Sequence, residues 1–218
     1  MVGQVARIRE LVAPRLRPGT RTIVGIAGPP GAGKSTLAAA VVADYGPDWG
    51  PGVSTGRAVG VPMDGFHLSN VELERLGLAD RKGAPATFDA DGFVHLLRRI
   101  RARDADLVYA PAYSRKLRES IGGAIPLSRD VELVVVEGNY LLLPEPPWAP
   151  VRELLDLAVF LDAPARVRLP GLVRRQRARG LDQAGAEDWV HRSDEANARL
   201  VAATRRYADA VLVRTERD

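Results

Sequence analysis

The stretch that decides the fold is residues 25–40, which read GIAGPPGAGKSTLAAA. Six small or turn-forming residues, Gly28 to Gly33, separate a strand-like apolar run from a run of helix-forming residues. Glycine loses more backbone entropy on folding than other residues, so a glycine cluster needs a physical reason. A loop whose backbone comes very close to a negatively charged ligand supplies that reason.

The residues of this stretch match the pattern G-x-x-x-x-G-K-[ST], the phosphate-binding P-loop. In such a loop, backbone N–H groups point at a phosphate chain, and the following helix adds the positive end of its dipole. We predict that Lys34 reaches the β- and γ-phosphates of ATP and takes part in catalysis, and that the Ser35 hydroxyl ligates Mg²⁺. The residues predicted to bind the nucleotide are Gly28, Pro29, Pro30, Gly31, Ala32, Gly33, Lys34, Ser35 and Thr36.

Composition limits the class of protein. The 218 residues are 46% hydrophobic and 27% charged, as in soluble globular proteins, and their number favours one domain over residues 1–218. The chain has no cysteine, which excludes disulfides and thiolate metal sites. The longest apolar run, residues 131–143, contains two glutamates, and the N-terminus has no apolar signal core. We therefore expect a cytoplasmic protein without a membrane partner.

The net charge is +4 at pH 7, and most of the cations are arginines. They are spread along the chain between Asp and Glu residues, whereas a nucleic-acid-binding patch would concentrate them. An anionic small-molecule ligand accounts for the surplus, so we expect no nucleic-acid partner. The sequence leaves the oligomeric state open, a homodimer included.

Strand-like and helix-like runs alternate along the chain, which indicates an α/β fold with a parallel sheet. Pro170 and Gly171 can kink or split a helix. Residues 109–128 are expected to form an irregular or hairpin-like segment, and residues 46–56 a connecting loop. The predicted strands are Thr22–Ala27, Ala58–Pro62, Leu133–Glu137, Leu157–Leu161 and Ala210–Val213, and the predicted helices lie near Gln4–Ala13, Ser35–Tyr45, Asp91–Arg103, Ala165–Arg179 and Ala184–Tyr207.

Carboxylates follow three predicted strands, at the edge where open parallel sheets bind ligands. Asp64 is predicted to be the catalytic base for an attacking hydroxyl, with the capping of a turn as the alternative. Glu137 ends an apolar run, where a carboxylate needs a cation or hydrogen-bond donors, so we predict that it holds Mg²⁺ directly or through water. A solvated glutamate is the alternative. Asp162 is expected to cap the following helix.

Residues 166–179 are rich in arginine, whose planar fork suits a transferring phosphoryl group. Only some of these arginines can point inward from a helix. We select Arg174 and Arg175 as catalytic and Arg168 as a contact to the nucleotide, and interpret the others as a solvated face. Other residues are expected to border the acceptor, although His67 is equally consistent with a structural hydrogen bond. These residues are His67, Arg81, Lys82, Tyr113 and Arg115.

A series of motifs resembles the uridine kinase, phosphoribulokinase and pantothenate kinase group of P-loop kinases. In order, they are GPPGAGKST, PMDGFHLSN, RKGAPATFD, PAYSRKL, VVVEGNYLLL and FLDAP, followed by the arginine-rich helix. The resemblance spans roughly residues 22–213. The sequence is most similar to a bacterial branch labelled as nucleoside or nucleotide kinases, or as fructose-transport kinases.

The resemblance implies a kinase that uses ATP and Mg²⁺ to phosphorylate a hydroxyl group of a small molecule. It implies a three-layer P-loop fold with five parallel strands in the order 2-3-1-4-5, and an arginine-rich lid at about residues 165–180. It also implies that Asp64 is the base, that Glu137 occupies the Walker-B-like position, and that Asn197 touches the acceptor site, with Trp189 in a packing role. The residues after Asp64 differ from those of uridine kinases, and pantothenate kinases tend to be longer. Sugars, nucleosides and pantothenate-like alcohols therefore stay open as acceptors.

A function of another class also stays open, namely a nucleotide-dependent switch or motor ATPase that acts on a protein partner. A GTPase would show an N/T-K-x-D motif for guanine, which this sequence lacks. The two classes differ in what stimulates ATP consumption, which is an added alcohol for a kinase and a macromolecule for a motor.

Overall fold

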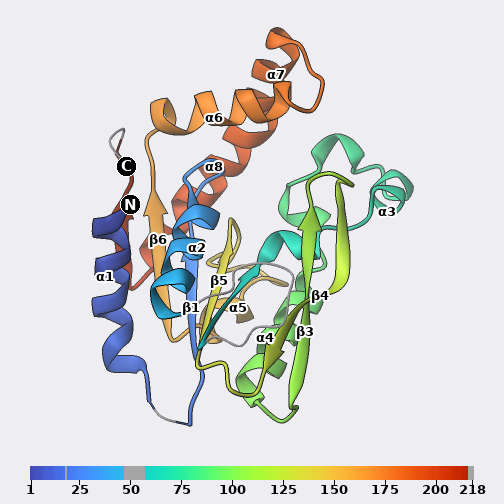
Figure 1. The fold of residues 1–218 in the computed structure, drawn as a ribbon. Coiled ribbons are helices and arrows are strands. Elements are labelled where there is room, and N and C mark those ends of the chain that lie inside the picture. The colour runs from blue at the N-terminus through green and yellow to red at the C-terminus, as the bar shows by residue number, and fades with distance from the viewer. Residues whose placement is uncertain (18, 47–56, 216–218) are drawn as a thin grey trace.

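Five parallel strands form the central sheet of the computed structural model, which describes residues 1–17, 19–46 and 57–215 (Figure 1). The sheet order is β2-β5-β1-β6-β7. Counting only these five strands, this is the expected order 2-3-1-4-5. Apart from Gly46, the predicted loop at residues 46–56 lies outside the described residues. The strands are β1 (Thr22–Ala27), β2 (Ala58–Pro62), β5 (Leu133–Gly138), β6 (Leu157–Asp162) and β7 (Ala210–Val213).

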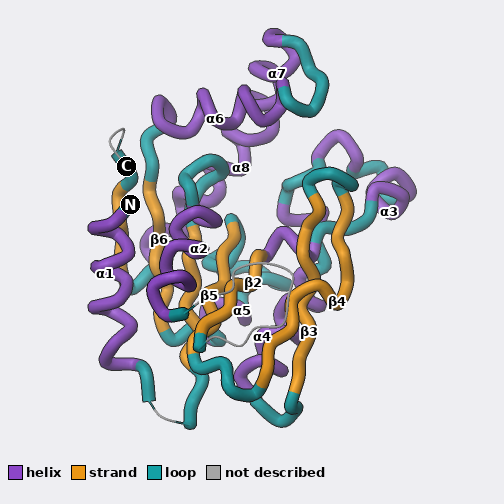
Figure 2. Tube along the Cα trace, in the orientation of Figure 1, coloured by secondary structure: helices purple, strands orange, loops and turns teal. Residues whose placement is uncertain are grey.

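The predicted helices are present, two short helices that were not predicted, α3 and α5, are added, and the helix nearest the C-terminus differs (Figure 2). The helix predicted over residues 184–207 consists of α7, a π-helical turn at Val190–Asp194, α8 and a 3₁₀ turn at Ala203–Tyr207. Pro170 lies inside α6 without splitting it. The helices are α1 (Val2–Val12), α2 (Lys34–Tyr45), α3 (Asn70–Arg75), α4 (Ala90–Ala102), α5 (Pro150–Glu153), α6 (Ala165–Arg177), α7 (Gln183–Trp189) and α8 (Glu195–Ala202). Within the described ranges, none of them has the length and apolarity needed to cross a bilayer.

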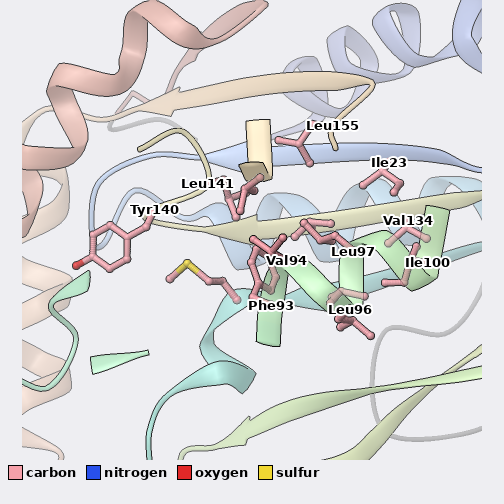
Figure 3. Packing of buried hydrophobic residues seen from close by; sticks show 14 of the residues in the cluster. Ile23, Phe93, Val94, Leu96, Leu97, Ile100, Val134, Tyr140, Leu141 and Leu155 are labelled. Carbon is pink, nitrogen blue, oxygen red and sulfur yellow. The ribbon is translucent and has the colours of Figure 1, made fainter. Parts of the chain in front are cut away.

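Apolar layers cover both faces of the sheet, because successive side chains of a strand point to opposite faces. On one face, Val24 and Ile26 of β1 pack in one cluster with residues of α1 and α2. On the other face, Ile23 belongs to a cluster with residues of α4 and α5, part of which Figure 3 shows. Burial on both faces explains why the central strands read as continuous apolar runs. The sheet and its two layers make the expected three-layer fold.

A second sheet consists of the antiparallel hairpin β3 (Leu107–Ser114) and β4 (Glu119–Ser128), where the sequence predicted an irregular or hairpin-like segment. It packs against the 3₁₀ turn at Met63–Phe66 that follows β2. A Cβ at Gly65 would overlap the carbonyl oxygen of Pro111, so only glycine allows this approach. Figure 1 shows the hairpin and α3 on one side of the molecule, and α6 and α7 above the ends of the central strands.

Candidate active site

The P-loop connects β1 to α2 at the carboxyl edge of the sheet. Gly33 precedes α2 with a φ of +97°, a left-handed conformation that glycine adopts without strain. A Cβ at Gly28 would overlap the backbone carbonyl oxygen of Leu161 in β6. The path of the loop therefore requires glycine at both positions. Because glycine has no side chain, a phosphate chain can approach the backbone N–H groups there.

Lys34 begins α2, and its side chain is buried. Its Nζ donates to the carbonyl oxygen of Pro29 at 3.0 Å and to Oδ1 of Asn139 at 2.7 Å. A lysine ammonium has three N–H donors, which leaves one for a ligand. Burial lowers the pKa of Lys34 to about 8, and the charges of Glu137 and Asp64 oppose this effect. A bound phosphate chain would favour the charged form in the same way.

The Ser35 hydroxyl donates to Oε1 of Glu137 at 2.9 Å. Burial, and then the charge of Asp64, raise the pKa of Glu137 to about 7 against the opposing charge of Lys34. A hydroxyl and a carboxylate side by side are ligands that a hard cation prefers. In residues 1–17, 19–46 and 57–215, no group of three or more His, Cys, Asp or Glu side chains could hold a metal ion. A cation at this pair would complete its shell with phosphate oxygens and water, as Mg²⁺ does.

The buried carboxylate makes stability depend on pH. The pKa of Glu137 is about 7 in the folded chain against 4.5 ordinarily, so the folded state binds more protons and the free energy of unfolding falls as pH rises between these values. Glu137→Gln removes this slope. We expect the stability of the variant relative to the wild type to increase from pH 5 to pH 8 by at most about 3 kcal/mol. Urea denaturation without nucleotide or metal measures the difference, and parallel curves for the two proteins would contradict it. Glu145→Gln, at an exposed position, is the control.

Asp64 lies in the 3₁₀ turn directly after β2 and lines the same cavity as Lys34 and Glu137. Its negative charge raises the pKa of both of these side chains, which places the three groups within electrostatic reach of one another. Its backbone oxygen lies 2.8 Å from Nδ1 of His67. A carboxylate therefore faces the space next to the lysine of the P-loop, which is the arrangement that phosphoryl transfer to a hydroxyl requires.

The loop that carries Lys82 and Gly83 also contributes to the lining of the cavity. The carbonyl oxygen of Gly83 accepts hydrogen bonds from the hydroxyl of Tyr140 and from Nδ2 of Asn197, the latter at 3.3 Å. Lys82 donates to the carbonyl oxygen of Arg118 at 2.9 Å. Asn197 thus lines the cavity and also holds the loop that carries Lys82 and Gly83.

The sequence matches the Phosphoribulokinase / Uridine kinase family over residues 23–218. The chain belongs to this family. The resemblance stated from the motifs is confirmed, and the chain is a kinase, a phosphotransferase with an alcohol group as acceptor. Membership also implies the use of ATP with a divalent metal ion.

Several relatives of this kinase cover most of its length. It is 34% identical over 203 residues to the uncharacterized protein YggC of Escherichia coli (strain K12). These residues cover 92% of this chain and 81% of that protein. Among solved structures, a "putative fructose transport system kinase" from Silicibacter sp. TM1040 is 36% identical, with a TM-score of 0.81 and coverage of 95% of this chain and 98% of that one. The pantothenate kinase of Lacticaseibacillus casei (strain BL23) is 30% identical over 162 residues, which are 74% of this chain and 51% of that protein.

The cavity of this kinase has a volume of about 190 Å³, measured as the space open to the centre of a water molecule, and it brings most of the predicted site residues together. Gly28, Pro29, Ala32 and Thr36 belong to the loop and the first helical turn behind its lining. Arg81 is exposed and lies outside the lining. The predicted residues that line it are Pro30, Gly31, Gly33, Lys34, Ser35, Asp64, His67, Lys82, Tyr113, Arg115, Glu137, Arg175 and Asn197.

The arginines in α6 and directly after it that line the cavity differ from the predicted ones. Arg175 lines the cavity together with Arg179, which the prediction did not select. The two residues are four positions apart, which places them on one side of the helix predicted over residues 165–179. In the structure, Arg179 lies in the turn that follows α6. Arg174 is exposed and lies outside the lining. The spacing of four residues was the available signal for choosing Arg179 over Arg174.

Arg168 does not face the cavity, which corrects its selection as a contact to the nucleotide. It is 6% exposed, and its guanidinium donates to the carbonyl oxygens of Ala163 at 3.0 Å and Pro30 at 3.1 Å. It also forms an ion pair with Glu195 of α8 at 2.9 Å. The hydrogen bond to Pro30 links α6 to the P-loop, and the ion pair with Glu195 links α6 to α8. Arg168 therefore has a structural role.

Arg168→Met should destabilise the fold by about 2 to 3 kcal/mol, because it leaves Glu195 without its cation. We place the value at the lower end for a broken buried pair, since 20% of the Glu195 side chain is exposed. Urea denaturation measures the loss. Arg177→Met, at an exposed position of the same helix, should change stability by less than about 0.5 kcal/mol. Equal stability of the two variants would contradict a structural role for Arg168.

Two further differences concern polar residues at the sheet edge and around the cavity. Asp162 does not cap α6, because Pro164 occupies the N-cap position and no side chain accepts a hydrogen bond there. Asp162 instead forms an ion pair with Arg205, with 3.9 Å between the charged atoms.

Some residues that line the cavity were not predicted from the sequence. Asn139 could have been predicted, since it closely follows a strand at the ligand-binding edge. The other missed residues include Arg118, Gln176, Arg179, Ser193 and Asp194, and Trp189 lines the cavity although a packing role was expected.

Proposed function

We propose that this kinase transfers the γ-phosphoryl group of ATP to a hydroxyl group of a sugar, a nucleoside or a pantothenate-like alcohol. The observation that carries the proposal is the position of Asp64 in one cavity with Lys34 and the pair formed by Ser35 and Glu137. Small-molecule kinases in the family support the same reaction class.

The P-loop side of the cavity would hold the donor. Backbone N–H groups of the loop and the third N–H of Lys34 bind the phosphate chain, and Ser35 and Glu137 hold Mg²⁺. When bound, Mg²⁺ neutralises charge on the β- and γ-phosphate oxygens. Arg175 faces the same cavity, and its positive charge acts on Lys34. We assign to Arg175 the stabilisation of negative charge on the transferring group.

Asp64 would hold the acceptor hydroxyl and take its proton. As the hydroxyl oxygen forms its bond to the γ-phosphorus, the bond from this phosphorus to the bridging oxygen of the β-phosphate breaks and ADP leaves. A carboxylate oxygen of Asp64 accepts the proton that the hydroxyl oxygen loses. Water can also attack the phosphoryl group, so the site must exclude it while the acceptor is bound. We assign that task to closure of residues 165–180, which contribute Arg175, Gln176 and Arg179 to the cavity.

The test measures the product and not ATP loss alone. The purified protein with ATP and Mg²⁺ is incubated with a panel of alcohols, and phosphorylated product and ADP are quantified together. We expect ADP and phosphorylated alcohol to form in equal amounts with an accepted alcohol. A switch or motor ATPase would instead form ADP and free phosphate, and a macromolecule would stimulate it.

A binding measurement identifies alcohols for this panel. In the presence of a non-hydrolysable ATP analogue, an accepted alcohol at a hundredfold its dissociation constant should add about 2.7 kcal/mol of stability. Stabilisation by the alcohol without any transfer from ATP would contradict the proposed reaction.

A further inference from the structure

The cations of the cavity form two groups. Lys34, Arg115 and Arg175 form the first group, because Arg175 is among the charges that act on Lys34 and Arg115 among those that act on Glu137. Lys82, Arg118 and Arg179 form the second group. Burial lowers the pKa of Lys82, the charge of Glu119 opposes this effect, and the charges of Arg118 and Arg179 lower the pKa further. The proposed function uses residues of the first group only.

The second group is assembled from three separate segments. Lys82 follows the 3₁₀ turn at Ala79–Arg81, Arg118 lies in the turn between β3 and β4, and Arg179 follows α6. Among the residues that the structure describes, no carboxylate lies within 4.0 Å of the charged nitrogens of these three side chains. Three positive charges therefore converge without forming an ion pair.

The groups around these cations offset their positive charge only in part. Burial lowers the pKa of His67 and raises the pKa of Tyr113, so that both side chains are neutral near pH 7. The carboxylate of Glu119, which acts on Lys82, accepts hydrogen bonds from the backbone N–H of Asn70 at 3.0 and 3.3 Å. Over the whole lining, six cations face three carboxylates, Asp64, Glu137 and Asp194.

Two of the three lining carboxylates act on the lysine of the P-loop, and the third is influenced by both groups of cations. Glu137 and Asp64 act on Lys34, and Asp194 is influenced by Arg175 before Arg179. The cavity therefore carries an excess of positive charge, and none of the cations Lys82, Arg118 and Arg179 is held in an ion pair in the part of the chain that the structure describes. Holding three cations close to one another costs free energy, which a ligand of opposite charge recovers.

We propose that the acceptor is an anionic alcohol, which carries a phosphate or carboxylate group besides its hydroxyl, and that Lys82, Arg118 and Arg179 bind this group. The inference rests on the proposed function and narrows its substrate class. Ammonium and guanidinium groups bind such oxyanions through charge-assisted hydrogen bonds. With the anionic group held there, the hydroxyl of the acceptor points toward Asp64, which lines the cavity together with both groups of cations.

The binding test uses inorganic phosphate as the probe. The protein is first saturated with a non-hydrolysable ATP analogue and Mg²⁺, so that the P-loop is filled, and phosphate is then titrated by calorimetry. We expect saturable binding that Lys82→Met and Arg118→Met each weaken about ten- to hundredfold, the effect of one lost hydrogen bond between charged groups. Arg98→Met, at an exposed position of α4, makes the same change in charge and should leave phosphate affinity unchanged.

Unchanged affinity for the ATP analogue shows that each variant is folded. Binding of phosphate that neither Lys82→Met nor Arg118→Met weakens would overturn the inference, as would the absence of phosphate binding to the wild type.

The activity test compares matched acceptors. Sugars and polyols are supplied as the neutral alcohol, as its monophosphate and as its carboxylic acid, and phosphorylated product is measured. We expect turnover of monophosphates or acids, and the preferred form distinguishes a phosphate from a carboxylate as the anionic group. A preference for neutral alcohols overturns the anionic acceptor and leaves the proposed kinase reaction intact. ATP consumption that only a protein partner stimulates overturns the proposed function itself.

Discussion

Asp64→Asn should lower the rate of phosphoryl transfer by about 10²- to 10⁴-fold while affinity for the ATP analogue stays near that of the wild type. The substitution keeps the size of the side chain and its place in the turn after β2. It removes the carboxylate that would take the proton of the acceptor hydroxyl. Because Asp64 acts on the acceptor, the binding of the phosphate chain by the P-loop does not depend on it.

Two controls make the result specific to Asp64. Asp80→Asn makes the same chemical change at an exposed position outside the cavity, and should keep full activity. Loss of the negative charge at Asp64 also removes an effect that raises the pKa of Lys34 and Glu137. The comparison is therefore made over a range of pH. Recovery of wild-type activity at any pH would remove proton acceptance by Asp64 from the mechanism.

Arg175→Met should lower kcat by about 10³-fold or more, whereas Arg174→Met should change it by less than about threefold. The two arginines are neighbours in α6, but only Arg175 lines the cavity, where its charge acts on Lys34. Methionine keeps an unbranched stem of similar length, so the comparison isolates the guanidinium group. The loss for Arg175 arises because no other group of α6 replaces its charge on the transferring phosphoryl group.

The measurement is a steady-state rate at saturating ATP and acceptor, with the thermal midpoint of each variant as a check on folding. A similar loss for both arginines would show that α6 acts through its net charge and not through one positioned side chain. A loss for Arg174 alone would contradict the role assigned to Arg175.

Local patterns in the sequence predicted the fold and the phosphate end of the cavity. The P-loop is a contiguous motif in which each residue type has its own physical reason, and Gly28 and Gly33 have the backbone environment that the motif requires. The central strands are buried on both faces, so their apolar runs carry a strong signal. Asp64 and Glu137 follow such strands, which places them at the ligand-binding edge before any packing is known.

Tertiary packing decided what the sequence did not predict. A run of arginines on a helix does not reveal which face meets a neighbour, and Arg168 is directed at the P-loop backbone because α6 crosses behind it. The π-helical turn at Val190–Asp194 leaves no mark in the periodicity, yet it carries Ser193 and Asp194 into the cavity. Arg118 reaches the cavity only because the hairpin folds back over the turn after β2, a contact between segments far apart in sequence.

The most direct test of the proposed site is a crystal structure with a non-hydrolysable ATP analogue and Mg²⁺. We predict phosphate oxygens on the backbone N–H groups of the P-loop and on Lys34, the metal ion at Ser35 and Glu137, and the γ-phosphate facing Asp64. A P-loop without phosphate, or a γ-phosphate that points away from Asp64, would contradict the proposed arrangement of donor and acceptor.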